Sequence, residues 1–295
     1  MKHLKASSGI LTTITLLLWA SAFSGIRVAL EDYSPEHLGL LRYGIASIAT
    51  LFLCFFWRPQ FPKLKDWPHF FLTGLIIVPV YTISINYAEQ TISAGSTSFI
   101  ISLVPVITGF FAPIILKEAP EKGTWIGLAF CIPGIALISF GEGDSFTFSI
   151  GVAWGCLSAL SGATTILLQK SLLKTYDGYT VSAWTMWTGT FFMLFFLPGL
   201  KTSIGQASLS STLSVIYLGI FPGAIAYITF AMAMKNLSAA RISRFLFLIP
   251  ILSLIVAFFW LREIPTTLTL AGGGITLAGV ILSQRKPTKR SRQPS

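Results

Sequence analysis

Two arginines lie deep within long apolar segments, where an arginine could bind an anion. Arg42 interrupts the segment that starts at Pro35, and Arg244 lies in the segment that starts at Ser238. A guanidinium within a lipid bilayer costs about 2.5 kcal/mol or more unless it is paired. The planar guanidinium can donate two parallel hydrogen bonds to the two oxygens of a carboxylate. We therefore predict that Arg244, together with Arg42, binds an anionic group of a small molecule; the alternative is that Arg244 snorkels into the headgroups.

Polar aromatic and amide side chains form a second set of candidates. A tyrosine hydroxyl or an indole N–H needs a partner or water when it is buried. Cavity lining and helix packing explain each of these residues equally well. The substrate-binding candidates in this set are Trp19, Tyr81, Asn86, Trp184 and Tyr227.

The remaining charged residues lie near segment ends. We predict that Arg27 snorkels toward Glu31 or water and that Arg241 snorkels at the cytoplasmic face. No expected span carries a central Asp or Glu, so proton coupling through a buried carboxylate is not expected. Facilitated diffusion or exchange is the resulting prediction.

Motifs for catalysis are missing from the sequence. There is no His-Glu-X-X-His, no Gly-X-Ser-X-Gly and no phosphate-binding loop. The three cysteines lie inside apolar runs, which favours packing over a disulfide or a metal site. We expect no enzyme activity, no metal and no cofactor.

Composition places these residues in a membrane. The chain has 295 residues, 53% of them hydrophobic and 11% charged, whereas a soluble domain has about 25% charged residues. The net charge of +10 is explained by basic cytoplasmic loops, without a nucleic-acid partner. The expected partners are the lipid bilayer and a small-molecule substrate, and the oligomeric state stays open.

The candidate residues have to be positioned by membrane-spanning helices of about 20 apolar residues each. We predict an all-α polytopic protein with ten such helices. The expected spans are Ile10–Leu30, Pro35–Trp57, Trp67–Tyr87, Ser93–Leu116, Gly123–Phe140, Ser149–Leu172, Tyr179–Leu197, Ser211–Met234, Ser238–Leu261 and Leu268–Ser283. Lys and Arg concentrate in the alternate loops and in the C-terminal tail, which predicts that both termini are cytoplasmic in the inner (plasma) membrane.

The spans divide into two similar halves. Residues 93–120 align without a gap with residues 238–265, at an offset of 145 (238 minus 93), so that Pro105 meets Pro250 and Glu118 meets Glu263. Since each half has an odd number of spans, the second half must enter the membrane in the opposite sense. We predict two inverted five-helix repeats, 1–145 and 146–295 with a basic tail.

The matched residues have expected roles. Pro105 and Pro250 each remove a backbone hydrogen bond within a span, which predicts bending helices beside a central path; a static kink is the alternative. Pro79, Pro133 and Pro222 have no partner at this offset and are expected to be packing features. Glu118 and Glu263 are expected to terminate spans and organise loops without carrying protons.

Several motifs together resemble the EamA-type transporters of the drug/metabolite transporter superfamily. They are Leu-Leu-Trp-Ala-Ser-Ala-Phe in the first span, Arg42-Tyr43, Leu-Lys-Glu-X-Pro, Leu-Arg-Glu-X-Pro and the segment from Leu218 to Tyr227. The resemblance implies ten helices, a central cavity lined by spans one to four and six to nine, and peripheral fifth and tenth spans. One departure is Gly162, where many relatives carry Trp.

The resemblance also implies a secondary transporter that exports small metabolites, such as amino acids or related organic acids, by alternating access. A channel and a non-transporting structural membrane protein are the alternatives.

Overall fold

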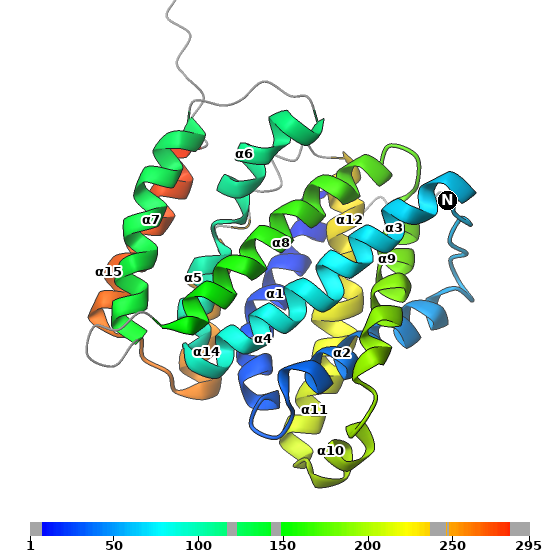
Figure 1. Cartoon of the computed structure of the whole chain (residues 1–295), viewed down its shortest axis with the longest axis horizontal. Coiled ribbons are helices and arrows are strands. Elements are labelled where there is room, and N and C mark those ends of the chain that lie inside the picture. The colour runs from blue at the N-terminus through cyan, green and yellow to red at the C-terminus, as the bar shows by residue number, and fades with distance from the viewer. Residues whose placement is uncertain (1–7, 117–122, 143–148, 237–245, 247, 284–295) are drawn as a thin grey trace, which may run out of the picture.

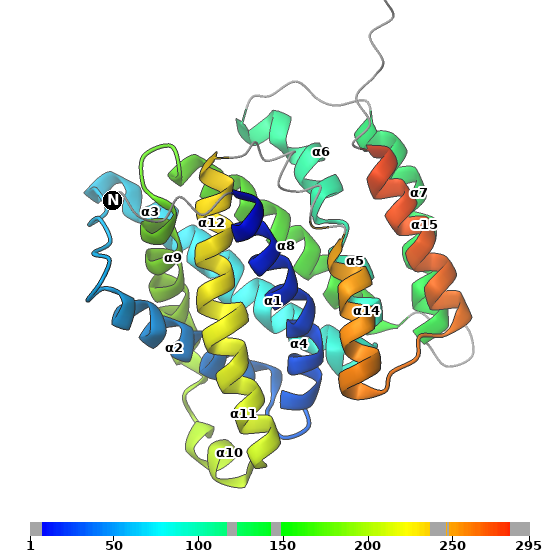
Figure 2. The ribbon, with the colours of Figure 1, turned by 180° about the vertical axis from the view of Figure 1, so that it is seen from behind.

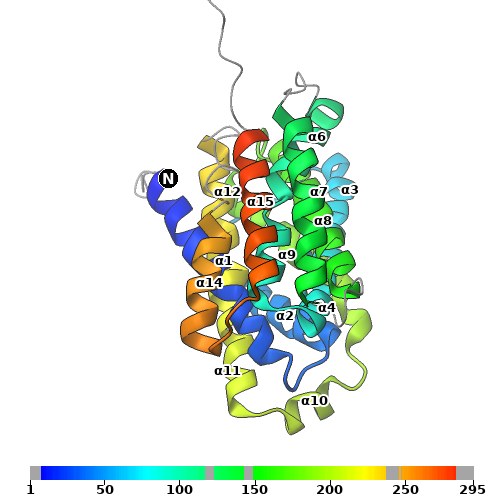
Figure 3. The same ribbon diagram turned by 90° about the vertical axis from the view of Figure 1, so that its left-hand side faces the viewer.

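The structure is a bundle of helices with a pair of helices at one edge (Figures 1 and 3). It is a computed structural model that describes residues 8–116, 123–142, 149–236, 246 and 248–283. No strand occurs in these residues. The chain is therefore all-α over the part that the structure describes.

The helices follow the expected segments closely. In the first half they are α1 (Ser8–Ala29), α2 (Pro35–Leu53), η1 (Leu64–Asp66), α3 (Trp67–Leu75), η2 (Ile76–Val80), α4 (Tyr81–Thr91), α5 (Ala94–Ile101), α6 (Val104–Leu116) and α7 (Gly123–Glu142). In the second half they are α8 (Ile150–Leu172), α9 (Gly178–Met193), η4 (Leu194–Phe196), α10 (Leu200–Gln206), α11 (Leu209–Leu218), η5 (Gly219–Ile225), α12 (Ala226–Asn236), α14 (Leu248–Leu261) and α15 (Thr267–Ser283).

Five helices within the described residues are long and apolar enough to cross a membrane. They are Gly9–Ala29, Leu64–Thr91, Ala94–Phe111, Ile150–Leu172 and Leu209–Lys235. A sixth arises if α9 and α10, which meet at 88°, form one broken span. Three shorter apolar helices, at the positions of α7, α14 and α15, accompany them. The fold is that of a polytopic membrane protein.

Helix α1 lies near the middle of the bundle. It packs against α12 on one side and α14 on the other, as Figure 2 shows from behind. Its other contacts are with α11, η5, α5 and α4. The first helix of the chain thus touches mainly elements of the second half.

Two long helices contain a π-helical break with a proline inside it. The break η2 contains Pro79, and η5 contains Pro222. A proline lacks an N–H, so the helix loses a hydrogen bond there. Near Pro79 the hydroxyl of Thr82 donates to the carbonyl of Ile77 at 3.3 Å. The two prolines, which have no partner at the offset of 145, thus lie in the same kind of break, and the breaks are five and seven residues long.

The matched prolines Pro105 and Pro250 each lie in the first turn of a described helix. Helix α5 ends at Ile101 and α6 begins at Val104, just before Pro105. Helix α14 begins at Leu248, which puts Pro250 in its first turn, where a proline removes no hydrogen bond from the helix. The expected mid-span kink at Pro250 is therefore a helix start among the described residues.

Helices α7 and α15 pack on each other through glycines. A Cβ on Gly134 would lie 2.7 Å from the carbonyl oxygen of Gly272, and one on Gly272 would lie 2.5 Å from that of Gly134. A Cβ on Gly279 would lie 2.9 Å from the carbonyl of Gly127. The backbones touch, so no larger residue fits at these positions.

Replacing Gly272 by valine is expected to force α7 and α15 apart and lower the melting temperature of the detergent-purified protein. Overpacking of this kind costs about 1–3 kcal/mol. Gly274→Val is the matched control, because Gly274 lies on the same helix and a Cβ added there would meet no heavy atom within 4 Å. Equal melting temperatures for the two variants would contradict the packing role of Gly272.

Candidate functional site

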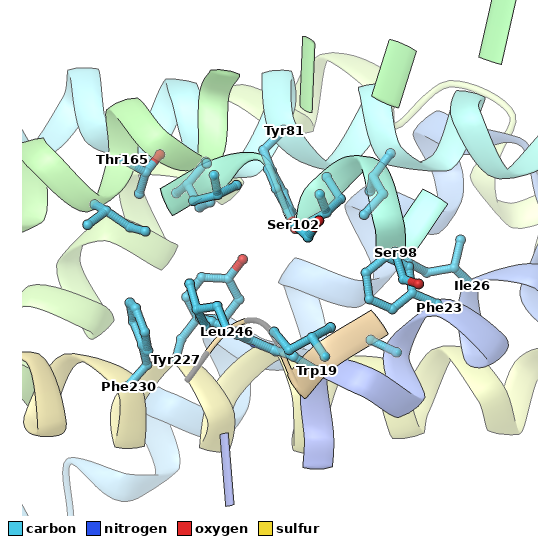
Figure 4. Close-up of a pocket in the computed structure, with 18 of the residues that line it drawn as sticks. Trp19, Phe23, Ile26, Tyr81, Ser98, Ser102, Thr165, Tyr227, Phe230 and Leu246 are labelled. Carbon is cyan, nitrogen blue, oxygen red and sulfur yellow. The ribbon is translucent and has the colours of Figure 1, made fainter. Parts of the chain in front are cut away.

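A cavity lies in the centre of the bundle, between α1 and α12 on one side and α4, α5 and α8 on the other (Figure 4). It has about 80 Å³ of room for the centres of water molecules. A cavity with roughly 10–15 Å³ of water-occupied volume already holds one water, so this cavity has room for several. The peripheral helices α7 and α15 contribute no lining residue, and neither does α9.

Arg42 gives the cavity a positive charge. Its side chain lines the cavity from α2 and is only 3% exposed. The Nε atom has no hydrogen-bond partner among the described residues. The guanidinium carbon lies 5.5 Å from the ring centroid of Tyr43, which gives some cation–π stabilisation. A buried guanidinium with an unpaired donor is suited to bind an anion.

Aromatic rings form one wall of the cavity. The ring of Trp19 lies 5.2 Å from that of Tyr227 and 4.7 Å from that of Phe230. The hydroxyl of Tyr43 donates to that of Tyr227 at 3.1 Å. Figure 4 shows Tyr227 and Tyr81 approaching the cavity from opposite sides. The wall is apolar with hydroxyl groups at its inner edge.

Small hydroxyl side chains form the other wall. Ser98 donates to the carbonyl of Gly95 at 2.6 Å, and Thr165 donates to that of Ser161 at 2.9 Å. Ser102 bonds to its own helix in the same way. Because these hydroxyl hydrogens are used within the helices, their oxygens remain available as acceptors. This wall can therefore receive hydrogen bonds from an ammonium or amide group.

Four of the predicted residues line this cavity, namely Trp19, Arg42, Tyr81 and Tyr227. Asn86 does not; it is buried and donates to the carbonyl of Pro35 at 2.8 Å.

Trp184 also lies outside the cavity. Its indole donates to the carbonyl of Gln60 at 2.9 Å and packs against Trp67. Arg241, Arg244 and Glu118 lie outside the residues that the structure describes.

Sequence reasoning missed several lining residues, which are Phe23, Ser98, Ser102, Thr165, Gln169 and Phe230. The spacing of Ser98 and Ser102 puts both on one face of a helix, and the same holds for Thr165 and Gln169. A search for paired polar residues at this spacing in apolar segments would have found them. Gly162 also lines the cavity, where a Cβ would lie 3.3 Å from the Tyr81 ring.

Arg27 is tied to the second half of the chain. Its Nε lies 3.5 Å from Glu263 Oε1, and its Nη1 donates to the carbonyl of Glu89. The other oxygen of Glu263 accepts from the backbone N–H of Ala94 at 3.2 Å, at the start of α5. Arg27 was expected to snorkel toward Glu31 or water; its side chain is 38% exposed, and its charged partner is Glu263, which the turn after α14 brings to α1.

Glu89 is a buried carboxylate just beyond the expected span Trp67–Tyr87. It lies near the end of α4, yet it is 0% exposed, because α8, α2, α1 and α5 pack against α4. The covering elements are distant in sequence, so only the tertiary structure could reveal the burial.

Comparison with known proteins gives a consistent family. The model of the EamA-like transporter family matches residues 7–140 and again 149–284. The chain is 38% identical over 276 residues to the "Uncharacterized transporter YdfC" of Bacillus subtilis, covering 93% of this chain and 90% of the relative. It is 34% identical over 284 residues to a "Probable terminal-alkyne amino-acid exporter" of Streptantibioticus cattleyicolor, covering 96% and 95%.

A protein of known crystal structure has the same fold, with a TM-score of 0.66 at 15% identity, and covers 94% of this chain and 95% of the other.

Replacing Glu263 by glutamine removes the charge that pairs with Arg27. Because both side chains are partly exposed, we expect a loss of about 1 kcal/mol or less, seen as a small drop in melting temperature. Glu31→Gln, at an exposed acid just beyond α1, is the control and should leave the melting temperature unchanged. An equal effect of the two substitutions would show that the pair does not stabilise the bundle.

Proposed function

The chain belongs to the EamA-like transporter family, and from this premise we propose that it is a secondary transporter of small metabolites that carry a carboxylate, with amino acids as the first class. The observation that carries the proposal is Arg42, a buried guanidinium that lines the central cavity and whose Nε has no hydrogen-bond partner among the described residues. A carboxylate of the substrate would pair with this guanidinium.

The opposite wall supports a zwitterion rather than a simple anion. The hydroxyl oxygens of Ser98, Ser102 and Thr165 can accept hydrogen bonds from an ammonium group. The aromatic faces of Trp19 and Tyr227 favour a cation as well. The relative from Streptantibioticus cattleyicolor is described as a "Probable terminal-alkyne amino-acid exporter", which agrees with this class of substrate and with export as the direction.

The size of the cavity supports a small substrate. The cavity has about 80 Å³ of room for the centres of water molecules, which is enough for several waters. A compact substrate such as alanine suits a cavity of this kind. Larger side chains would need the cavity to widen.

We also propose ten spans in two inverted five-helix repeats, 1–145 and 146–295. At the offset of 145, Gly127 corresponds to Gly272 and Gly134 to Gly279. The contacts join Gly134 to Gly272 and Gly127 to Gly279, which is the exchange expected across a two-fold axis. Since these contacts make the two helices antiparallel, such an axis is perpendicular to them and lies in the membrane plane.

The basic loops and tail support cytoplasmic termini and insertion in the inner (plasma) membrane. The transport mode we propose is alternating access around the cavity. A channel is the second possibility. Saturable counterflow separates the two, because a carrier transiently accumulates labelled substrate while unlabelled substrate leaves through the same site, whereas a channel only equilibrates the label.

The test is counterflow of radiolabelled L-alanine into proteoliposomes loaded with unlabelled L-alanine. Arg42→Ala is expected to lose at least about 90% of the counterflow, because the carboxylate loses a charge-assisted pair that contributes about 1.5–3 kcal/mol. Arg42→Lys keeps the positive charge but loses the planar guanidinium that can form two parallel hydrogen bonds to a carboxylate. This variant should therefore retain part of the counterflow.

Arg58→Ala is the matched control, because Arg58 is an exposed arginine beyond the end of α2 and should transport like the parent. Size-exclusion profiles show that each variant is folded. Parental counterflow by a well-folded Arg42→Ala protein would overturn the proposed role of Arg42. Absence of saturable counterflow for the parent with a panel of small amino acids would overturn the proposed substrate class.

A further inference from the structure

Gln169 is a polar residue of the cavity wall that has no role in holding the carboxylate or the ammonium group of the proposed substrate. It lines the cavity from α8, four residues after Thr165, and is only 3% exposed. Residues four apart share one face of a helix. Helix α8 passes the ring of Tyr81 at Gly162 before it reaches Thr165, which lies at one end of the cavity (Figure 4). Gln169 therefore belongs to this end.

The amide of Gln169 makes no hydrogen bond within the part of the chain that the structure describes. The next residue differs, since the amine of Lys170 donates to the carbonyl of Met234 at 2.8 Å. An amide that is removed from water without a partner is unfavourable, and an exception among buried polar groups needs an explanation. A methionine would fill similar space without this penalty, so the amide points to a use.

The side chains around this end of the cavity do not supply the missing hydrogen bonds. Thr165 donates its hydroxyl hydrogen to the carbonyl of Ser161, within α8. Phe230 lies on the other side of the cavity from Thr165 and has no polar atom in its side chain (Figure 4). Neither residue can donate to the carbonyl oxygen of the Gln169 amide. A substrate that displaces water from this end must therefore satisfy the amide itself.

The charge of the lining limits which polar groups can do so. Arg42 is the one charged residue among the described residues that line the cavity, and the proposed function assigns it the carboxylate of the substrate. A second carboxylate or a basic group in the substrate side chain would have no counter-ion in the wall. Burying an unpaired charge is costly. An uncharged polar group suits this end of the cavity best.

We propose that Gln169 recognises a hydroxyl or carboxamide group in the side chain of the substrate, so that the preferred cargo is an amino acid with a short, uncharged polar side chain, such as serine. An amide donates through its N–H groups and accepts through its carbonyl, and a hydroxyl does both as well. An aliphatic side chain that displaces water leaves the amide unpaired, which is how a polar site rejects an apolar analogue. This inference rests on the proposed function, because it concerns the side chain of the same substrate.

The test compares L-serine with L-α-aminobutyrate as inhibitors of radiolabelled L-alanine counterflow in proteoliposomes. The two amino acids have the same length and differ by a hydroxyl in place of a methyl, so the room in the cavity affects both alike. We expect L-serine to inhibit the parent at a concentration about tenfold lower, because the hydroxyl pairs with an amide that is otherwise unsatisfied. Gln169→Met, which keeps the length but removes the amide, should bring the ratio of the two inhibitory concentrations close to one.

Gln206→Met is the matched control, because Gln206 is an exposed glutamine at the end of α10, away from the cavity, and its variant should keep the parental ratio. Size-exclusion profiles report folding. A parental ratio close to one would overturn the inference even if Gln169→Met did not fold, and so would a folded Gln169→Met protein that keeps the preference for L-serine. Absence of L-alanine counterflow in the parent would instead overturn the proposed function, and this inference with it. Counterflow without a preference for L-serine would overturn only the role of Gln169.

Discussion

Where lipid surrounds a protein, its backbone hydrogen bonds must be made inside the protein, and irregular backbone is tolerated only in the interior or beside a cavity. The interruptions of this bundle obey that constraint. Ile77 lies within the break η2, and Tyr227 follows the break η5 closely. Ser102 lies between α5 and α6, and Ile249 lies in the first turn of α14. All four residues line the central cavity, so the breaks in separate helices meet at one place, and this convergence is what sets the cavity at the centre.

The charged residues separate into two groups for a physical reason. Arg27 and Glu263 are partly exposed, paired with each other and joined to the start of α5, so they can hold helices together. Arg42 and Glu89 are buried, and among the described residues Arg42 Nε and both Glu89 oxygens lack hydrogen bonds. Buried charge without a partner lowers stability. A transporter can use this cost, because a substrate or a proton that supplies the partner then binds more tightly.

Patterns within short stretches could be read from the sequence, and relations between distant stretches could not. Hydrophobic length located most helices to within a few residues, and the cost of a buried charge singled out Arg42. The burial of Glu89 depends on α8, α2, α1 and α5 packing against α4, and no local signal records that. Trp184 was expected to bind substrate because it lies deep within a span, but its side chain points away from the cavity and bonds to Gln60. Depth within a span does not determine which side of the helix a residue lies on. Burial along a span and orientation around it are separate properties, and hydropathy reports only the first.

Alternating access needs some contacts that stay fixed and some that change. The glycine contacts between α7 and α15 bring backbone against backbone, so sliding one helix past the other would drive side chains into main-chain atoms. These helices also lie away from the cavity and pack mainly on each other. By contrast, α5 and α6 are joined only through an interrupted turn before Pro105, where fewer hydrogen bonds oppose a change of angle. The interrupted helices beside the cavity are therefore the elements whose rearrangement costs least, and α7 with α15 supplies the rigid edge against which they would move.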